Sequence, residues 1–443
     1  MPESDPLAGN HPKPMLQKTG LLMQCRTSSW STLLLILTLV ALPKAGILVR
    51  GIPITWGYLV VIVLGMIGFT EWLQGLRSNT SCRLSVLPLA CLIPFQSILI
   101  GTFIVLGYER PGYALSLMFS FMAMPYLMAG LANSIPIQAS AGLWLRDSVR
   151  FVLVYGMLIF LISNISGWFI ELPGLTTMLG GDVPLAGKNN DRYGIYKFTS
   201  TYSNGNIYGI CLLMLLPLYA RLETGWFKLL AKLSIVLTLS RTAWIGLVLY
   251  DCGVLFKAAM ERRFHQILRS LLALGIDLVV IKLVSSFTRW GSSGVIDKNL
   301  GGRLPQLGIL ADLKERWLEG DYVGFLLPVK AFIRIYEMTY LGILEGFGVL
   351  GLIFFILAMG CPVYFIGRIA RESGNPWLQA ACLSMILYLI VAFSDGALVN
   401  APVMAFYWAL VFFSLSAYER NLSGDTTQAR QQPSRSFRLL KSR

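Results

Sequence analysis

The stretch LSIVLTLSRTAWIGLVLYDCGVLF, residues 233–256, is almost entirely apolar but carries Arg241 near its middle and Asp251 beyond it. A charged side chain at the centre of a bilayer costs at least about 2.5–3.5 kcal/mol, and a charge kept there marks a candidate functional site. Either one long helix buries the cation, or two shorter helices meet at Ser240 and Arg241. The topology of the remaining chain distinguishes these alternatives.

The composition restricts the class of protein. The chain has 443 residues, of which 55% are hydrophobic and 14% charged, and its mean hydropathy is +0.63. These values are typical of polytopic membrane proteins and exclude an ordinary soluble domain. The first thirty residues are polar and lack a small-residue cleavage site, so we expect no removable signal peptide.

The seven cysteines are scattered along the chain and show no metal-ligand spacing. None of them lies in the two long polar loops described below. We therefore expect neither a disulfide framework nor a metal site, and no bound cofactor.

Runs of about 20 apolar residues are long enough to cross a bilayer. They occur near residues 31–49, 52–75, 84–107, 113–131, 151–170, 204–220, 270–285, 338–364, 377–395 and 402–418. If residues 225–260 contribute two more, the chain is an all-α polytopic membrane protein with about 12 transmembrane helices. Residues 31–418 then form the membrane domain, between an N-terminal tail of residues 1–30 and a basic tail of residues 419–443.

The distribution of lysine and arginine orients these spans. With a cytoplasmic N-terminus and two spans in 225–260, almost all short basic segments fall in the cytoplasm, as the positive-inside rule requires. They carry Arg77, Arg83, Arg146, Arg150, Arg221, Lys228, Lys232, Lys257, Arg262, Arg263, Arg269, Arg368 and Arg371. This asymmetry accounts for most of the net charge of +14 without nucleic-acid binding. Both termini are therefore predicted to be cytoplasmic.

The same count of bilayer crossings favours a hairpin of two helices with Arg241 at its outer tip. Each arm has only about 15 residues, roughly 22 Å of helix, so we expect the tip to lie in a polar recess within the protein. The alternative is an arginine that extends into the lipid headgroups.

This topology leaves two long external loops, residues 171–203 and 286–337. The first is rich in Gly, Pro, Asn and Asp, which predicts irregular structure, and it brings Lys188, Arg192 and Lys197 to the outer face. In the second loop, leucines recur every three or four residues after Arg303, which predicts an amphipathic helix at the membrane surface.

The end of the second loop places Lys330, Arg334 and Glu337 at helical spacing, where an Arg334–Glu337 ion pair is the simplest interpretation. External aromatic residues gather in both loops, and either stack on sugar rings or belong to an interfacial belt. They are Tyr193, Tyr196, Tyr202, Trp290, Tyr322 and Tyr336.

Outward arginines require an anionic partner. The guanidinium fork matches phosphate oxygens in a bidentate manner, so a lipid-linked diphosphate at the outer leaflet would suit them. Contact with ordinary phospholipid headgroups is the alternative.

Four stretches together resemble the bacterial O-antigen ligase and polymerase superfamily of membrane glycosyltransferases. They are FTSTYSNGNIYGICLLMLLPL (198–218), LTLSRTAWIGLVL (237–249), GGRLPQL (301–307) and YLGILEGFGVLGLIFFIL (340–357), in the order expected for the family. The likeness covers roughly residues 198–357, and it places Asn206 in an N-P-N-like turn and Arg241 in the arginine position of an L-T-x-S-R-x-A motif.

The chain departs from the ligases of that family at one place. Glu337 and Met338 stand where those ligases carry a His-Asn pair, and the two histidines of the chain, His11 and His265, are both expected in the cytoplasm. The departure favours a polymerase-type member.

The resemblance implies transfer of a glycan from an undecaprenyl-diphosphate-linked oligosaccharide to a sugar hydroxyl at the periplasmic face of the bacterial inner membrane. A chain-length regulator and a flippase would be its partners, besides the lipid bilayer. Arg192, Arg241 and Arg303 are the candidates for holding the diphosphate. The reaction needs charge stabilisation rather than protonation of the leaving group, and it requires no metal.

Further site residues follow from the same reasoning. Glu337, in the histidine position, is the first candidate for a general base, and Asp191 is the second; simple orientation of the acceptor is the third possibility. The remaining candidates for substrate binding are Arg334, Asn206, Tyr336 and Asp395, the last of which either binds sugar or caps a helix.

Two other functions remain open. One is a ligase that joins the glycan to lipid A–core, and the other is a transporter or flippase of lipid-linked sugars. Transporters place ionisable groups near the bilayer midplane and contain internal repeats. Here the intramembrane carboxylates are few, namely Glu71, Asp251 and Asp277, and the two halves show no repeat.

Overall fold

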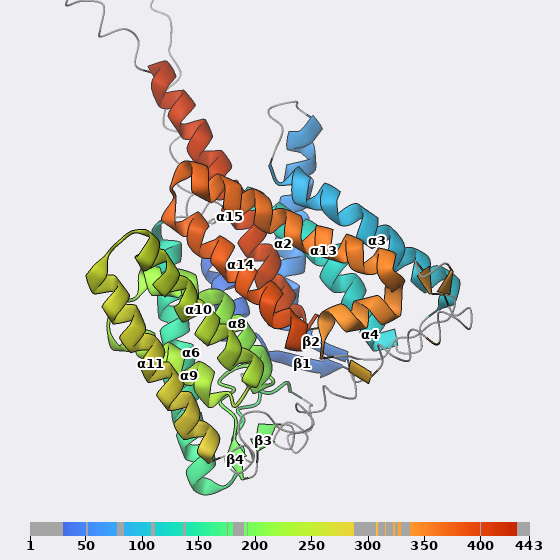
Figure 1. The fold of residues 1–443 in the computed structure, drawn as a ribbon. Helices are drawn as coiled ribbons and strands as arrows, with labels where there is room; N and C mark the ends of the chain where they lie inside the picture. The colour runs from blue at the N-terminus through green and yellow to red at the C-terminus, as the bar shows by residue number, and fades with distance from the viewer. Residues whose placement is uncertain are drawn as a thin grey trace, which may run out of the picture.

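A computed structural model of the chain shows a bundle of long helices (Figure 1). It describes residues 30–49, 52–77, 84–107, 111–135, 139–174, 176–179, 190–192, 194–287, 307–308, 315, 322–323, 327–328, 337–398 and 400–431. Eight of the helices in this described part are long and apolar enough to cross a membrane. The prediction of an all-α polytopic membrane protein is confirmed at that level, and the number of about 12 spans stays a prediction.

The elements follow in chain order. The first half contains η1 (Leu37–Ala41), β1 (Gly46–Val49), β2 (Ile52–Thr55), α2 (Trp56–Arg77), α3 (Val86–Leu106), α4 (Pro111–Met118), η2 (Phe119–Ala123), α5 (Met124–Ser134) and α6 (Ala139–Ser166). The second half contains β3 (Asp191–Arg192), β4 (Ile195–Tyr196), α8 (Gly205–Leu222), α9 (Trp226–Leu237), α10 (Arg241–Met260), α11 (Phe264–Ser286), β5 (Tyr322–Val323), β6 (Leu327–Pro328), α13 (Thr339–Ser373), α14 (Pro376–Asp395) and α15 (Ala401–Gln431).

The helix break that the sequence predicts within 225–260 is present. Helix α9 ends at Leu237 and α10 begins at Arg241. Between them Leu239 has a φ of 52°, which a helix cannot accommodate, and the Ser240 hydroxyl accepts a hydrogen bond from the Ala243 amide at 3.5 Å. Two shorter helices therefore meet at Ser240 and Arg241, and one continuous helix across this stretch is excluded. That both of them cross the bilayer stays a prediction.

Two of the predicted spans differ from the helices of the structure. The expected span 31–49 is a short apolar helix, Trp30–Ala41, followed by β1, which pairs with β2 in an antiparallel hairpin. Twelve helical residues rise only about 18 Å, so this helix is shorter than a bilayer core. Helix α6 begins at Ala139, twelve residues before the predicted start of its span. Helix α15 continues to Gln431, and the boundary between the membrane domain and the C-terminal tail stays a prediction.

Helices α2 and α5 approach each other closely because glycines face the contact. A Cβ added to Gly68 would lie 2.4 Å from the Gly130 carbonyl oxygen, and one added to Gly130 would lie 2.4 Å from the Phe69 nitrogen. Small residues of this kind allow helix backbones to pack tightly within membranes. In α13, Gly348 adopts a φ of 72° and divides the helix into two segments.

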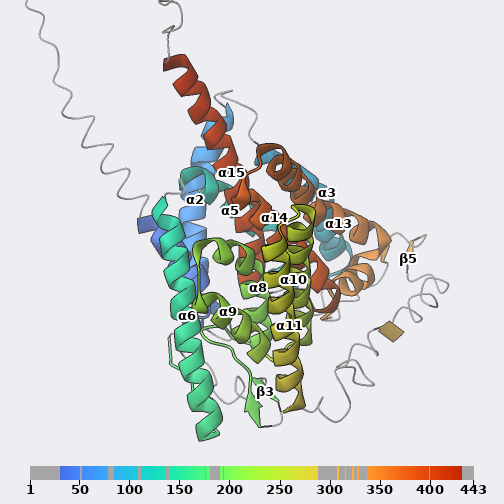
Figure 2. The same cartoon turned by 60° about the vertical axis from the view of Figure 1, so that its left-hand side comes forward.

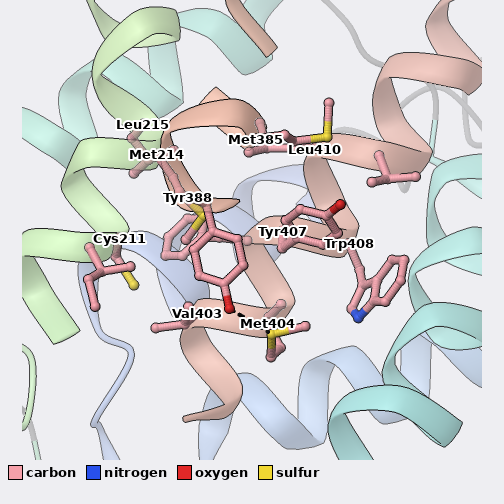
Figure 3. Close-up of a cluster of buried hydrophobic side chains, with 14 of the residues drawn as sticks. Cys211, Met214, Leu215, Met385, Tyr388, Val403, Met404, Tyr407, Trp408 and Leu410 are labelled. Atoms are coloured by element: carbon pink, nitrogen blue, oxygen red, sulfur yellow. Dashed lines mark hydrogen bonds between the residues drawn. The ribbon is translucent and has the colours of Figure 1, made fainter. Parts of the chain in front are cut away.

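The helices form two groups around a shared core. In Figure 1, α6, α9, α10 and α11 lie on one side and α2, α3, α13 and α15 on the other, while α8 and α14 lie between them. The core between these groups contains Tyr388 on α14, with Met404 and Tyr407 on α15 and Cys211 on α8 (Figure 3). The Tyr388 hydroxyl contacts the Met404 sulfur at 3.5 Å and donates to the Gly396 carbonyl at 2.9 Å.

Short strands cover the end of the bundle opposite the C-terminal end of α15 (Figure 2). The Leu48 amide in β1 donates to the Leu179 carbonyl at 2.9 Å, so the first predicted loop packs against the N-terminal hairpin. An ion pair between Lys44 and Glu171, at 2.8 Å, joins the same two segments. The end of the bundle that carries these loops is the end predicted to face outward.

Candidate functional site

Polar side chains gather where four helices end. The first turns of α8, α10 and α13 surround the last turn of α14. The N-terminus of a helix carries partial positive charge and unsatisfied N–H groups. Three such termini at one end of a bundle therefore create a region that favours an anion, provided that further cations are near.

Asn206 connects α8 to α14. Its side-chain amide donates to the Asp395 carboxylate at 3.0 Å, and its side-chain oxygen accepts from the Lys197 ammonium at 3.2 Å. Lys197 and Asp395 are 2% and 7% exposed, so this chain of charge-assisted hydrogen bonds lies inside the protein. The turn that precedes α8 is fixed by Asn204, whose side chain accepts from the Asn206 amide at 2.9 Å.

Asn190 anchors the β3–β4 hairpin to the same helix start. Its side-chain oxygen accepts from the Gly205 amide at 3.3 Å, and its carbonyl accepts from the Lys197 amide at 2.8 Å. Asn190 is fully buried. The hairpin therefore orients Lys197 toward the first turn of α8.

Thr242 connects α10 to α14. Its hydroxyl and the Ser394 hydroxyl are 2.9 Å apart, in hydrogen-bond contact. Arg241, the preceding residue, is the first residue of α10 and is partly buried. The structure thus brings Arg241 to the helix end that Asn206 and Asp395 also share.

The start of α13 completes this end of the bundle. The Gly396 amide, directly after α14, donates to the Glu337 carbonyl at 3.3 Å. A Cβ at Gly396 would lie only 1.9 Å from the Thr339 hydroxyl oxygen, so a residue larger than glycine does not fit there without displacement. Glu337 itself is exposed, two residues before α13 begins.

We refer to Lys197, Asn206, Arg241, Thr242, Glu337, Ser394 and Asp395 as the polar end cluster. Of the predicted site residues, it unites Arg241, Asn206, Glu337 and Asp395.

Asp191 lies on the β3–β4 hairpin, next to Asn190. Its carboxylate accepts from the Gly194 amide at 2.8 Å and so stabilises the hairpin turn, while its side chain is exposed. The backbone of Arg192 pairs with Ile195 in the same hairpin. Arg303, Arg334, Tyr336 and the side chain of Arg192 lie outside the described residues, as do the predicted amphipathic helix after Arg303 and the Arg334–Glu337 ion pair.

A second polar cluster lies deeper in the bundle, between α9, α10 and α11. The Lys232 ammonium contacts the Asp251 carboxylate at 2.5 Å and the Asp277 carboxylate at 2.8 Å, and all three side chains are buried. Lys232, which the charge distribution predicts in a cytoplasmic segment, is instead buried within α9 and pairs with both carboxylates. The signal in the sequence was a lysine in one apolar helix and one aspartate in each of the next two, because such charges are expected to pair inside a membrane.

The described residues contain no group of three or more His, Cys, Asp or Glu side chains placed to hold a metal ion. Lys197 and Arg241 are the two cations of the polar end cluster. No protein-family model and no curated protein matches the chain.

Proposed function

We propose that the protein is a polysaccharide polymerase that transfers glycan from an undecaprenyl-diphosphate-linked donor to a sugar hydroxyl on an acceptor. The active site would be the polar end cluster, facing the periplasm in the bacterial inner membrane. The observation that carries this proposal is the convergence of Arg241, Asn206 and Asp395, from three different helices, at the bundle end predicted to face outward.

The proposed chemistry is a displacement at the anomeric carbon of the donor sugar. The acceptor hydroxyl oxygen forms a bond to that carbon, the bond from the carbon to the diphosphate oxygen breaks, and the hydroxyl proton passes to a base or to water. The diphosphate leaves as an anion. Arg241, with the N–H groups at the start of α10, would stabilise the charge that develops on it.

The Lys197–Asn206–Asp395 chain supports this role indirectly. Asn206 accepts a hydrogen bond from the Lys197 ammonium and donates one to Asp395, which fixes Lys197 at the first turn of α8. A fixed cation in a water-poor site stabilises developing charge without reorganisation, which is more effective than a mobile one. Lys197 would thus be a positioning or binding cation beside Arg241.

Glu337 is the candidate general base. It is exposed just before α13, and its backbone carbonyl accepts a hydrogen bond from the Gly396 amide. Glu337 therefore lies at the same end of the bundle as Arg241. Asp191 is the second candidate; its bond to Gly194 leaves the other carboxylate oxygen for a proton. Asp395 is less suited, because it is buried and accepts from Asn206.

Reconstitution tests the proposal against its alternatives. Purified protein in liposomes would be supplied with lipid-linked repeat units and, separately, with lipid A–core as acceptor. Longer glycan on the lipid carrier is the result expected of a polymerase. Transfer to lipid A–core would instead identify a ligase, and movement of the lipid-linked sugar across the bilayer without new glycosidic bonds would identify a transporter.

A further inference from the structure

A cavity of about 240 Å³ opens between α9, α10 and α11. Lys228, Lys232, Tyr250, Asp251, Arg269 and Ser270 are among the residues that line it. It lies beyond Asp251, ten residues after Arg241 and therefore about 15 Å along α10 from the polar end cluster. The cavity is thus separate from the proposed active site and faces the other end of the bundle.

The charges around this cavity are not balanced. Lys232 pairs with both Asp251 and Asp277, which leaves one carboxylate charge in excess within that triad. Within the described part of the chain, Lys228 and Arg269 form no ion pair, so two cations face the cavity. Counted together, the three cations Lys228, Lys232 and Arg269 and the two carboxylates Asp251 and Asp277 leave a net charge of +1. An excess of positive charge in a partly enclosed site between membrane helices favours a phosphate group.

Asp251 lines the cavity as well. The Asp251 Oδ2 atom is buried and has no hydrogen-bond partner among the described residues. The excess cations Lys228 and Arg269 are therefore the groups of the cavity that fit a phosphate.

The walls and surroundings of the cavity are apolar and exposed. Leu229 and Val254, which line it, are 60% and 37% exposed, and Leu272 on α11 is 65% exposed. Trp226 and Phe264 begin α9 and α11 at the same end and are exposed as well, as expected for an interfacial aromatic belt. These apolar faces are suited to contact lipid chains.

We propose that this cavity binds the headgroup of an anionic glycerophospholipid, with its phosphate on Lys228 and Arg269. The bound lipid fills a charged gap between α9, α10 and α11 at the bundle end where positive charge predicts the cytoplasmic leaflet. The assignment is independent of the proposed glycan transfer.

The test compares full-length variants by native mass spectrometry after equilibration with equal amounts of phosphatidylglycerol and phosphatidylcholine. The wild type is expected to retain one phosphatidylglycerol. The Lys228→Gln/Arg269→Gln variant should lose about tenfold or more of that affinity, since each basic residue contributes substantially to binding of anionic lipid. The matched control, Arg263→Gln/Arg368→Gln, removes the same charge at exposed positions outside the cavity and should bind like the wild type.

Three outcomes would overturn the proposal. Equal loss in both double variants would mean nonspecific attraction by surface charge. Displacement of the lipid by millimolar inorganic phosphate would identify a free anion as the ligand. Because a variant can fail to fold, a second measurement uses the wild type and phosphatidylglycerol with a photoreactive chain: crosslinks should concentrate on α9, α10 and α11 around Leu229 and Leu272, and an even spread over the bundle would contradict the site.

Discussion

The side-chain amide of Asn206, in the first turn of α8, donates to the carboxylate of Asp395, the last residue of α14, at 3.0 Å. The two residues are 189 positions apart in the chain. Their contact joins α8 to α14 at one end of the bundle. The side-chain oxygen of the same Asn206 accepts a hydrogen bond from the Lys197 ammonium. The geometry of the proposed active site therefore depends on a neutral amide at position 206 beside a carboxylate at position 395.

Replacing Asn206 by Asp should damage the protein more than replacing it by Ala. Asn206→Asp places two carboxylates in contact in a buried setting, where like charges repel strongly. The exchange variant Asn206→Asp/Asp395→Asn restores one amide and one carboxylate, and its melting temperature in detergent should recover most of the loss. If the exchange variant melts no higher than Asn206→Asp alone, the two side chains do not interact as described.

Thr242 and Ser394 offer a quantitative check on the contact between α10 and α14. In a double-mutant cycle with Thr242→Val and Ser394→Ala, we expect a coupling energy of about 0.6 kcal/mol, the average for hydrogen bonds between membrane helices. Reversible unfolding in mixed micelles measures it. Strictly additive losses would show that the 2.9 Å contact contributes no stability.

The buried Lys232 should be essential only while its carboxylate partners are present. Lys232→Met leaves Asp251 and Asp277 without their cation, which costs about 3–5 kcal/mol for a buried pair. The triple variant Lys232→Met/Asp251→Leu/Asp277→Leu removes all three charges and should regain much of the stability. Yield of folded protein and the melting temperature report both effects. A harmless single Lys232→Met substitution would contradict the buried triad.

Glu223, in the turn between α8 and α9, should make stability sensitive to acid. Arg150 contacts both of its carboxylate oxygens, at 2.5 and 3.0 Å, and these bonds hold the pKa of Glu223 below its ordinary value of 4.5. Because the pKa is lower in the folded state, the stabilisation is present above the unfolded pKa and is lost as the pH falls through the folded one. The window therefore lies below about pH 4.5.

The matching measurement compares melting temperatures of the wild type and Glu223→Gln between pH 7 and pH 3.5. The variant should melt lower at pH 7 and approach the wild type at the acidic end. Parallel curves across the whole range would assign the acid sensitivity to other groups.

The sequence was sufficient for the membrane class and for the break before Arg241. Keeping the basic segments on the cytoplasmic side requires an even number of crossings in 225–260, and so predicts a break there. The structure places the break at Thr238–Ser240. Hydrophobicity did not distinguish helix from strand in 31–55, because apolar β-branched residues suit both. Pro43, Gly46 and Pro53 were the local signals of the hairpin that forms there.

The candidate site was predicted less completely. A polar residue within an apolar stretch stands out in the sequence, so Asn206, Arg241 and Asp395 could each be selected alone. Their pairing depends on the packing of α8, α10 and α14, which sequence spacing does not encode. Thr242 and Ser394 were missed for the same reason: small hydroxyl residues are common in membrane helices, and only their 2.9 Å contact reveals them.

The most direct test of the central claim is glycan extension by Arg241→Ala in liposomes supplied with lipid-linked repeat units. The protein should insert and melt like the wild type, while the extension rate falls by about 10²–10³-fold, as expected when one contact to a developing oxyanion is removed. Arg262→Ala, in the exposed turn between α10 and α11, is the control and should extend glycan normally. Wild-type chain lengths from Arg241→Ala would contradict the assignment of this arginine to the diphosphate.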